Sequence, residues 1–183
     1  MAGSGSISLP AVVGSVDPLQ SLSVLSASGV AIQSVTAVDA ISIPQQITLS
    51  QTPLTTFTSQ DHGDIVLGSI DGLAEGIHSL TVSTKGSGEI TLGVIGSGTA
   101  LGQVIVATGN QTSIHSIKTT DIITITTPIV LLDSSTLNTT VQSPTGAMIT
   151  LGRIDAITTG EQTLTINAGS SEVLLQGNGK LQM

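Results

Sequence analysis

The chain has 183 residues and a formal net charge of −8, because 12 Asp and Glu residues oppose only 4 Lys and Arg residues. This acidic balance argues against binding to nucleic acid or to anionic membrane surfaces, since both need clustered Lys and Arg side chains. There is no cysteine, which excludes a disulfide framework and thiol chemistry.

The apolar residues predict strands. They are nearly all Val, Ile, Leu and Ala, with one Phe, no Tyr and no Trp, and they are interleaved with Ser, Thr and Gly. β-branched residues favour pleated strands, and the helix formers Lys, Arg and Glu are scarce. The longest purely aliphatic run, Ile129–Leu132, falls far short of the roughly 18 apolar residues of a spanning helix. We therefore expect an all-β protein that does not insert into a membrane.

In chain order, the predicted strands are short segments in which apolar and polar residues alternate, so that one face is buried. Met1–Pro10 has no basic segment followed by an apolar core, so any export signal is expected to lie outside this sequence. Turn-forming Gly, Asn, Asp, Ser and Pro separate the strands. The strands are expected at 7–9, 22–24, 39–43, 47–49, 65–67, 80–82, 90–92, 104–106, 121–125, 130–132, 149–151, 164–166 and 173–175. The inward side chains are expected to be matched pairs such as Ile65/Leu67, Leu80/Val82, Ile90/Leu92 and Ile123/Ile125.

The same strand motifs recur at a nearly constant spacing along the chain. Ile7–Leu9 returns as Ile90–Leu92, and Ile65–Asp71 returns as Ile149–Asp155. We therefore predict one segment over 1–183 with internal repeats at about 7–89 and 90–172 and a partial third at 173–183. Both ends of the sequence fall inside a repeat, so we expect a portion of a longer array.

Two architectures fit these strands. A β-sandwich would join them by hairpins, for which Asn-Gly and Asp-Gly turns are typical. Asp71-Gly72 is one such dipeptide, but its counterpart in the second repeat is Asp155-Ala156, so the repeat does not require this turn. A parallel β-helix would instead coil the strands, with about four coils of roughly 20 residues in each repeat. We predict a parallel β-helix of about 8–9 coils, and the β-sandwich is the alternative.

The repeats resemble those of a known group of proteins. Gly63–Gly72, Ser79–Val82 and Gly86–Gly93, with Ala147–Gly152 and Gln162–Ile166, are similar to the strand repeats of filamentous-haemagglutinin-like adhesins and autotransporter passengers. The resemblance implies a right-handed β-helix, export from a Gram-negative bacterium, and a surface fibre acting in adhesion, aggregation or biofilm. It supplies no catalytic residues. The sequence lacks the secretion and anchoring domains of that group, and the aromatic residues that some of its members carry.

The densest polar cluster is Asp61-His62-Gly63-Asp64. Two carboxylates and an imidazole could ligate a metal ion. However, the matching stretch Ser143–Gly146 in the second repeat has no ligand, so a plain loop before the strand at Ile65 is the better interpretation. We predict no metal site and no cofactor.

Acidic residues recur at two matched pairs of positions, Asp71 with Asp155 and Asp39 with Asp121. Such acids could bind calcium or act as general acids. At four coils of separation they would lie roughly 20 Å apart along the axis and could not act on one bond. Hydrogen bonds from these carboxylates to backbone turns are therefore the favoured interpretation.

The remaining candidates are individually weak. His78 and His115 stand alone in the sequence, and His78 is interpreted as a solvated polar residue. Gly93–Gly98 lacks the following helix and the Lys of a phosphate-binding loop. Asn110–Thr112 and Asn138–Thr140 fit the glycosylation pattern, which arises readily by chance in a Thr-rich chain. We predict no catalytic residue, and a protein that is not an enzyme.

Three functions fit these expectations to different degrees. The favoured one is a structural or adhesive segment of an extracellular bacterial fibre, which would associate through its ends or walls or bind a receptor on a host or neighbouring cell. The alternative is a self-assembling filament or sheath subunit. A carbohydrate-active β-helix, such as a lyase or tailspike, is less favoured because Tyr and Trp platforms are absent and Lys and Arg number only 4.

Overall fold

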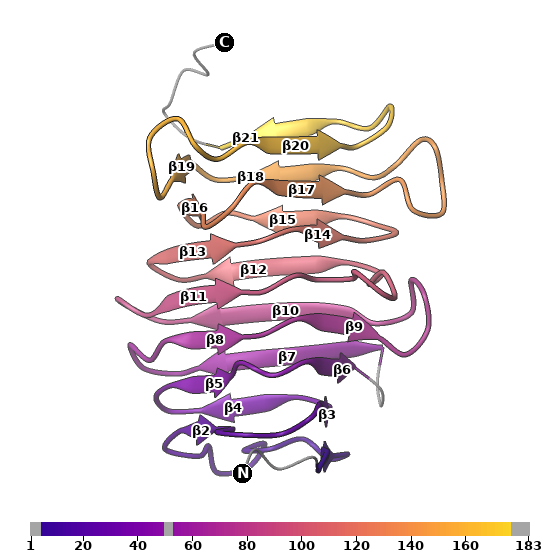
Figure 1. The fold of residues 1–183 in the computed structure, drawn as a ribbon. Coiled ribbons are helices and arrows are strands. Elements are labelled where there is room, and N and C mark those ends of the chain that lie inside the picture. The colour runs from indigo at the N-terminus through magenta and orange to yellow at the C-terminus, as the bar shows by residue number, and fades with distance from the viewer. Residues whose placement is uncertain (1–4, 50–52, 177–183) are drawn as a thin grey trace.

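The computed structural model describes residues 5–49 and 53–176, in which the regular structure consists of β-strands stacked along one axis (Figure 1). Every strand pair in these residues is parallel. The prediction of a parallel β-helix is therefore confirmed, and the β-sandwich alternative is wrong. The last part of the proposed third repeat, 177–183, lies outside the described residues. None of the described segments is a helix long and apolar enough to cross a membrane.

The strands form three faces, each named here after one of its strands. The β6 face contains β1 (Ile7–Leu9), β3 (Val30–Ile32), β6 (Ile47–Leu49), β9 (Ile70–Gly72), a single bridging residue Ile95, β14 (Ile117–Lys118), β17 (Ser135–Asn138) and β20 (Leu164–Asn167). The β7 face contains β4 (Val35–Ala37), β7 (Leu54–Ser59), β10 (Ser79–Thr84), β12 (Val104–Thr108), β15 (Ile123–Ile125), β18 (Ile149–Leu151) and β21 (Val173–Leu175). The β8 face contains β2 (Leu22–Ser23), β5 (Ile41–Ile43), β8 (Ile65–Leu67), β11 (Glu89–Leu92), β13 (Gln111–Ile114), β16 (Ile129–Leu131) and β19 (Ile154–Ala156).

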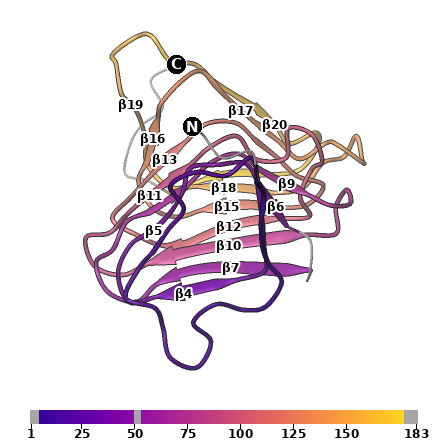
Figure 2. The same cartoon turned by 60° about the horizontal axis from the view of Figure 1, so that its bottom comes forward.

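The coil is right-handed. Each turn passes from the β6 face to the β7 face and then to the β8 face. Figure 2 looks obliquely from the N-terminal end and shows β5, β6 and β7 following one another clockwise as the chain recedes.

Within residues 5–49 and 53–176, two faces hold seven strands each, so the coil has about seven turns, and the prediction of 8–9 coils is wrong. The turns are longer than expected: Ile41, Ile65 and Ile90 are successive register partners, so the segments 41–64 and 65–89 are each one turn. The additional residues lie in corner loops, which add length to the chain without adding strands. Figure 1 shows such loops projecting between β9 and β10 and between β17 and β18.

The core is built from inward side chains that stack from turn to turn. On the β7 face, Val35, Phe57, Val82, Val106 and Ile125 stand directly in register and are fully buried. Most strands show the alternation buried–intermediate–buried that a single inward face requires. All eight residues of the predicted inward pairs are at most 1% exposed, so the sequence pattern identified the core correctly.

Buried hydroxyls help to close the corners of the coil. Thr119 Oγ1 donates to the carbonyl of Asp121 at 2.6 Å, and Ser135 Oγ donates to the carbonyl of Asp133 at 3.0 Å. Both hydroxyl residues are at most 2% exposed. Since a buried hydroxyl without a partner is destabilising, these hydrogen bonds explain how Thr and Ser can occur inside an otherwise aliphatic core.

Candidate functional site

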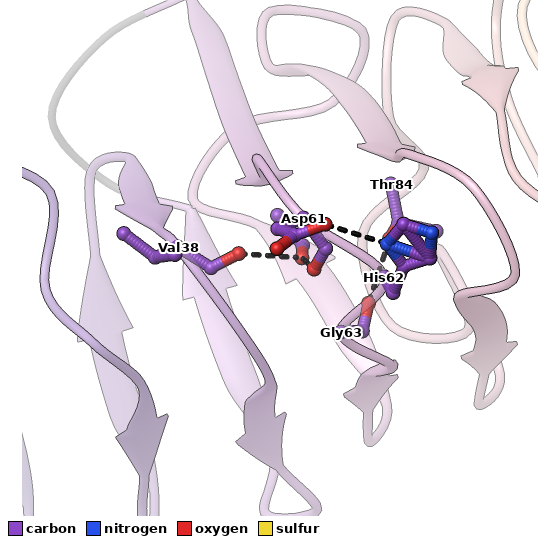
Figure 3. Close-up of polar contacts among 6 residues, drawn as sticks. Val38, Asp61, His62, Gly63 and Thr84 are labelled. Carbon is purple, nitrogen blue, oxygen red and sulfur yellow. Dashed lines mark hydrogen bonds and ion pairs between the residues drawn. The ribbon is translucent and has the colours of Figure 1, made fainter.

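The Asp61-His62-Gly63-Asp64 segment forms the corner between β7 and β8 (Figure 3). Asp61 Oδ1 and His62 Nδ1 lie 2.5 Å apart, and both side chains are about two-thirds exposed, at 68% and 66%. The Asp64 carboxylate has a different partner, since its Oδ1 accepts a hydrogen bond from the N–H of Glu89 at 2.9 Å. Within residues 5–49 and 53–176, no three His, Cys, Asp or Glu side chains are placed to hold one metal ion.

The backbone of this corner is held by hydroxyls from the inner side of β7 and β10. Ser59 Oγ donates to the Asp61 carbonyl at 3.0 Å, and Thr84 Oγ1 donates to the Gly63 carbonyl at 2.6 Å (Figure 3). A Cβ at Gly63 would clash with the Asp39 backbone of the preceding turn. The residue types at this corner are therefore explained by the close stacking of successive turns.

Asp71 and Asp155, which match in the sequence repeat, have different roles. Asp71 Oδ1 accepts hydrogen bonds from the backbone N–H groups of Gly98, at 2.9 Å, and Thr99, at 3.1 Å. The predicted carboxylate-to-backbone bond is thus confirmed for Asp71, although it reaches the next turn of the coil and not its own. Asp155 instead forms an ion pair with Arg153 (Nη2 to Oδ2, 2.8 Å) on an exposed part of the β8 face.

Asp39 and Asp121 lie at different corners, so the structure does not bring them together. Asp39 follows β4 and donates its backbone N–H to Gln20 of the preceding turn, at 2.8 Å. Asp121 precedes β15 and donates its N–H to Gly102, also at 2.8 Å. In both cases the backbone N–H of the aspartate bonds to a backbone carbonyl of the preceding turn.

The histidines differ from their interpretation in the sequence. His78 was expected to be solvated but is only 6% exposed, so that prediction is wrong. It ends the corner loop before β10, and its ring lies over Gly72, where a Cβ would come within 3.3 Å of His78 Cδ2. His115 is not isolated, because its Nδ1 lies 3.3 Å from Asp133 Oδ2.

The Gly93–Gly98 segment is a corner of the coil that contains one residue of the β6 face, Ile95. Ile95 is fully buried and bridges Ile70 and Ile117 of the neighbouring turns. Gly96 has a φ of 71°, a left-handed conformation that glycine adopts without strain. This segment provides backbone continuity for the β6 face, and no helix follows it in the described residues.

The two sequences that fit the glycosylation pattern differ in accessibility. Asn110 is exposed, while Thr112 is fully buried and its hydroxyl lies 2.6 Å from that of Thr127. Asn138 Oδ1 accepts hydrogen bonds from both the N–H and the hydroxyl of Thr140, at 2.8 and 2.9 Å. The second asparagine therefore stabilises its own turn.

The β6 face has a shallow depression of about 210 Å³ over its middle strands. Val94, Ile95, Ile117 and Lys118 contribute to its lining. It is open and largely apolar, and apart from Lys118 it brings no charged side chain among the described residues to its surface. Its polar lining residues contribute little of its surface, which distinguishes it from a small-molecule site with convergent polar groups: they are Ser97, Ser116, Thr136 and Asn138.

The most unusual surface is the outer side of the β7 face. None of its seven strands contains a charged residue. Its outward residues form ranks in register, Thr56–Thr81–Ile105–Thr124 and Thr36–Thr58–Ser83. By contrast, strands of the β6 face contain Asp71 and Lys118, and strands of the β8 face contain Glu89 and Asp155. The sequence did not reveal this surface, which becomes visible only when the strands are sorted into faces.

Together these features define the class of the protein: a three-faced, right-handed β-solenoid with an aliphatic core and hydroxyl-rich walls. Comparisons with protein-family models, with curated proteins and with solved structures found no match. Its function must therefore be inferred from this chain's own geometry.

Proposed function

We propose that the chain is a non-catalytic structural or adhesive segment of an extracellular bacterial fibre. The observation that carries the proposal is the continuous inward stack, in which each turn supplies the backbone partners and the apolar cover of the next. Such a fold is quasi-one-dimensional, so its length can increase turn by turn while its cross-section stays the same. A rod of this kind suits the task of carrying a contact surface away from a cell.

The distribution of titratable groups also supports a mechanical role. The ion pairs Arg153–Asp155, His115–Asp133 and His62–Asp61 all involve exposed or half-exposed side chains at corners or on the walls. Asp71 and Asp64, the acids with described backbone partners, tie successive turns together. Asp71 and Asp64 therefore stabilise the stack, and the titratable groups do not converge on a shared point among the described residues.

Insertion of one whole turn tests the proposal. Ile65 and Ile90 are register partners, so residues 65–89 constitute one complete turn. A second copy of 65–89 placed after Glu89 should raise the denaturant m-value and the free energy of unfolding, because the added turn buries more surface. The matched control is a Gly/Ser insertion of the same length at the same site. Equal stability of the two proteins would contradict a stacking rod.

The adhesive part of the proposal needs a cellular measurement. The chain displayed on a non-adherent bacterial cell should increase cell clumping or attachment, whereas the same display of a sequence-scrambled chain should not. Equal clumping and attachment of the two kinds of cell would contradict an adhesive role and leave a purely structural one.

A self-assembling filament subunit is the second candidate. Within the described residues, β19, β20 and β21 each have a strand neighbour on one side only, and such edges can pair with another chain. Electron microscopy of the purified protein separates the two functions. Long unbranched filaments support the subunit, and dispersed short rods support the fibre segment.

A further inference from the structure

We infer that the outer side of the β7 face is the surface through which a second copy of this solenoid packs side by side. The inference deepens the proposed fibre function, on which it rests, by naming the partner and the wall that meets it. The first reason is electrostatic. Two copies each carrying a net charge of −8 repel one another, and this repulsion is smallest where no charged side chain must be brought into contact.

Within the described residues, the strands of the β7 face meet that condition, although the outward Thr150 of β18 is only 5% exposed and adds little to the contact surface. Its strands contain no Asp, Glu, Lys, Arg or His from β4 to β21. The other two faces would each bring acids into the contact, Asp71 on one and Glu89 with Asp155 on the other. An approach through either of those faces would place like charges opposite each other or strip them of water.

The side chains of this face suit dry contact between sheets. The outward Thr residues are short and β-branched, so their rotamers are restricted and little side-chain entropy is lost on contact. Their methyl groups, with Ile105 and the half-exposed Leu54, provide apolar area, while neighbouring hydroxyls can bond to each other. Thr58 Oγ1 and Ser83 Oγ are already 3.4 Å apart within one copy.

The size of the face predicts a weak contact in a single segment. Seven parallel strands spaced about 4.8 Å apart give a height of about 30 Å. The six-residue strands β7 and β10 present three outward residues each, which gives a width of about 15 Å, whereas the three-residue strands β4, β15, β18 and β21 present one each. Each copy would thus bury at most about 500 Å², or about 1,000 Å² in total, which only reaches the lower limit for a specific interface. Because the face continues with every added turn, association should strengthen as the solenoid lengthens.

Sedimentation analysis of the complete chain tests the inference. The mean mass of the unmodified protein should rise above 18.3 kDa with concentration, and added salt should strengthen the association by screening the acidic charge. Thr81→Glu, at the centre of the β7 face, should weaken dimerisation at least tenfold. The matched control Thr91→Glu changes the same residue type at an outward position of β11 on the β8 face and should leave the dimerisation constant within twofold.

Circular dichroism and thermal melting of both variants confirm that any loss of mass does not result from unfolding. The inference is overturned if the unmodified chain remains at 18.3 kDa at all concentrations and salt levels, or if the two Glu variants weaken association equally. Either result leaves the rod itself intact, because the whole-turn insertion tests the rod without any dimer. Conversely, a failed insertion combined with a Thr81-sensitive dimer would reject the fibre segment and retain the contact face.

Discussion

Ile65 and Ile149 occupy matched positions of the sequence repeat, yet they lie on different faces of the coil. Ile65 belongs to β8, whereas Ile149 belongs to β18 on the β7 face, and both are fully buried. Three turns along the β8 face lead from Ile65 through Ile90 and Thr112 to Ile129, and two further strands then lead to Ile149. The repeat is therefore not a whole number of turns, and one strand motif serves equally well on different faces.

The single aromatic residue gives the first prediction. Phe57 is fully buried and stands between Val35 and Val82 in the inward stack. Phe57→Ala should lower the free energy of unfolding by about 3–5 kcal/mol because it leaves a cavity, while Phe57→Leu should cost less than about 2 kcal/mol. Urea denaturation measures both values. Leu25→Ala, at a side chain that is 89% exposed, is the control and should change stability by less than about 0.5 kcal/mol.

Asp71 and Asp155 offer a second, paired prediction. Asp71→Ala removes the acceptor of two backbone N–H groups in the next turn and should destabilise the protein by about 1–2 kcal/mol. Asp155→Ala removes an exposed ion pair and should cost less than about 1 kcal/mol. The urea midpoints of the two variants measure these losses of stability. If Asp71→Ala loses no more stability than Asp155→Ala, the hydrogen bonds from Asp71 to the next turn contribute nothing.

The inward and outward positions of one strand can be compared directly on β10. Thr84 is buried and donates to the Gly63 carbonyl, whereas Thr81 points outward on the same strand. Thr84→Val should cost about 1–3 kcal/mol because the buried carbonyl loses its partner. Thr81→Val should change stability by less than about 0.5 kcal/mol. Thermal melting of the two variants provides the comparison, and similar losses would mean that the corner hydroxyl is unimportant.

Two glycines with the same backbone conformation allow the energetic cost of backbone strain to be measured separately from that of a steric clash. Gly96 and Gly160 have φ values of 71° and 78°, but a Cβ at Gly96 would clash with the Lys118 carbonyl, while a Cβ at Gly160 would meet open space. Gly160→Ala should therefore cost only the left-handed backbone strain of about 1–2 kcal/mol. Gly96→Ala should cost clearly more, since adjacent turns must also separate. Differential scanning calorimetry would contradict this account if both variants melted at the same temperature.

The sequence predicted the parts of the fold that follow from short-range alternation. The pairs Ile65/Leu67 and Ile123/Ile125 were assigned to the core because apolar residues two positions apart point to the same side of a strand. The number of turns does not follow from the length of the repeat, because the repeat does not contain a whole number of turns. What recurs in the sequence is the strand motif and not the turn, and the corner loops make successive turns differ in length.

The burial of His78 and the absence of charge on the β7 face could not be predicted from this alternation. His78 stands between Ile77 and Ser79 in the sequence, which does not indicate burial, and its ring lies next to Gly72, which has no side chain to occupy that space. The uncharged β7 face depends on which strands share a face, which the sequence alone did not indicate. Once Thr56, Thr81 and Thr124 are placed in one rank, the absence of charge along it becomes visible.

Distances between spin labels on the β8 face test the central account most directly. The chain has no cysteine, so cysteines introduced at Ser23, Ser113 and Val130 would be the only labelling sites. Ser113 lies four strand steps from Ser23 and Val130 lies five steps away, which predicts Cα separations of about 19 and 24 Å at about 4.8 Å per step. Narrow distributions that differ by one strand spacing are the expected result. Broad distributions, or a difference of more than about 10 Å, would contradict a coil that advances by one strand per turn.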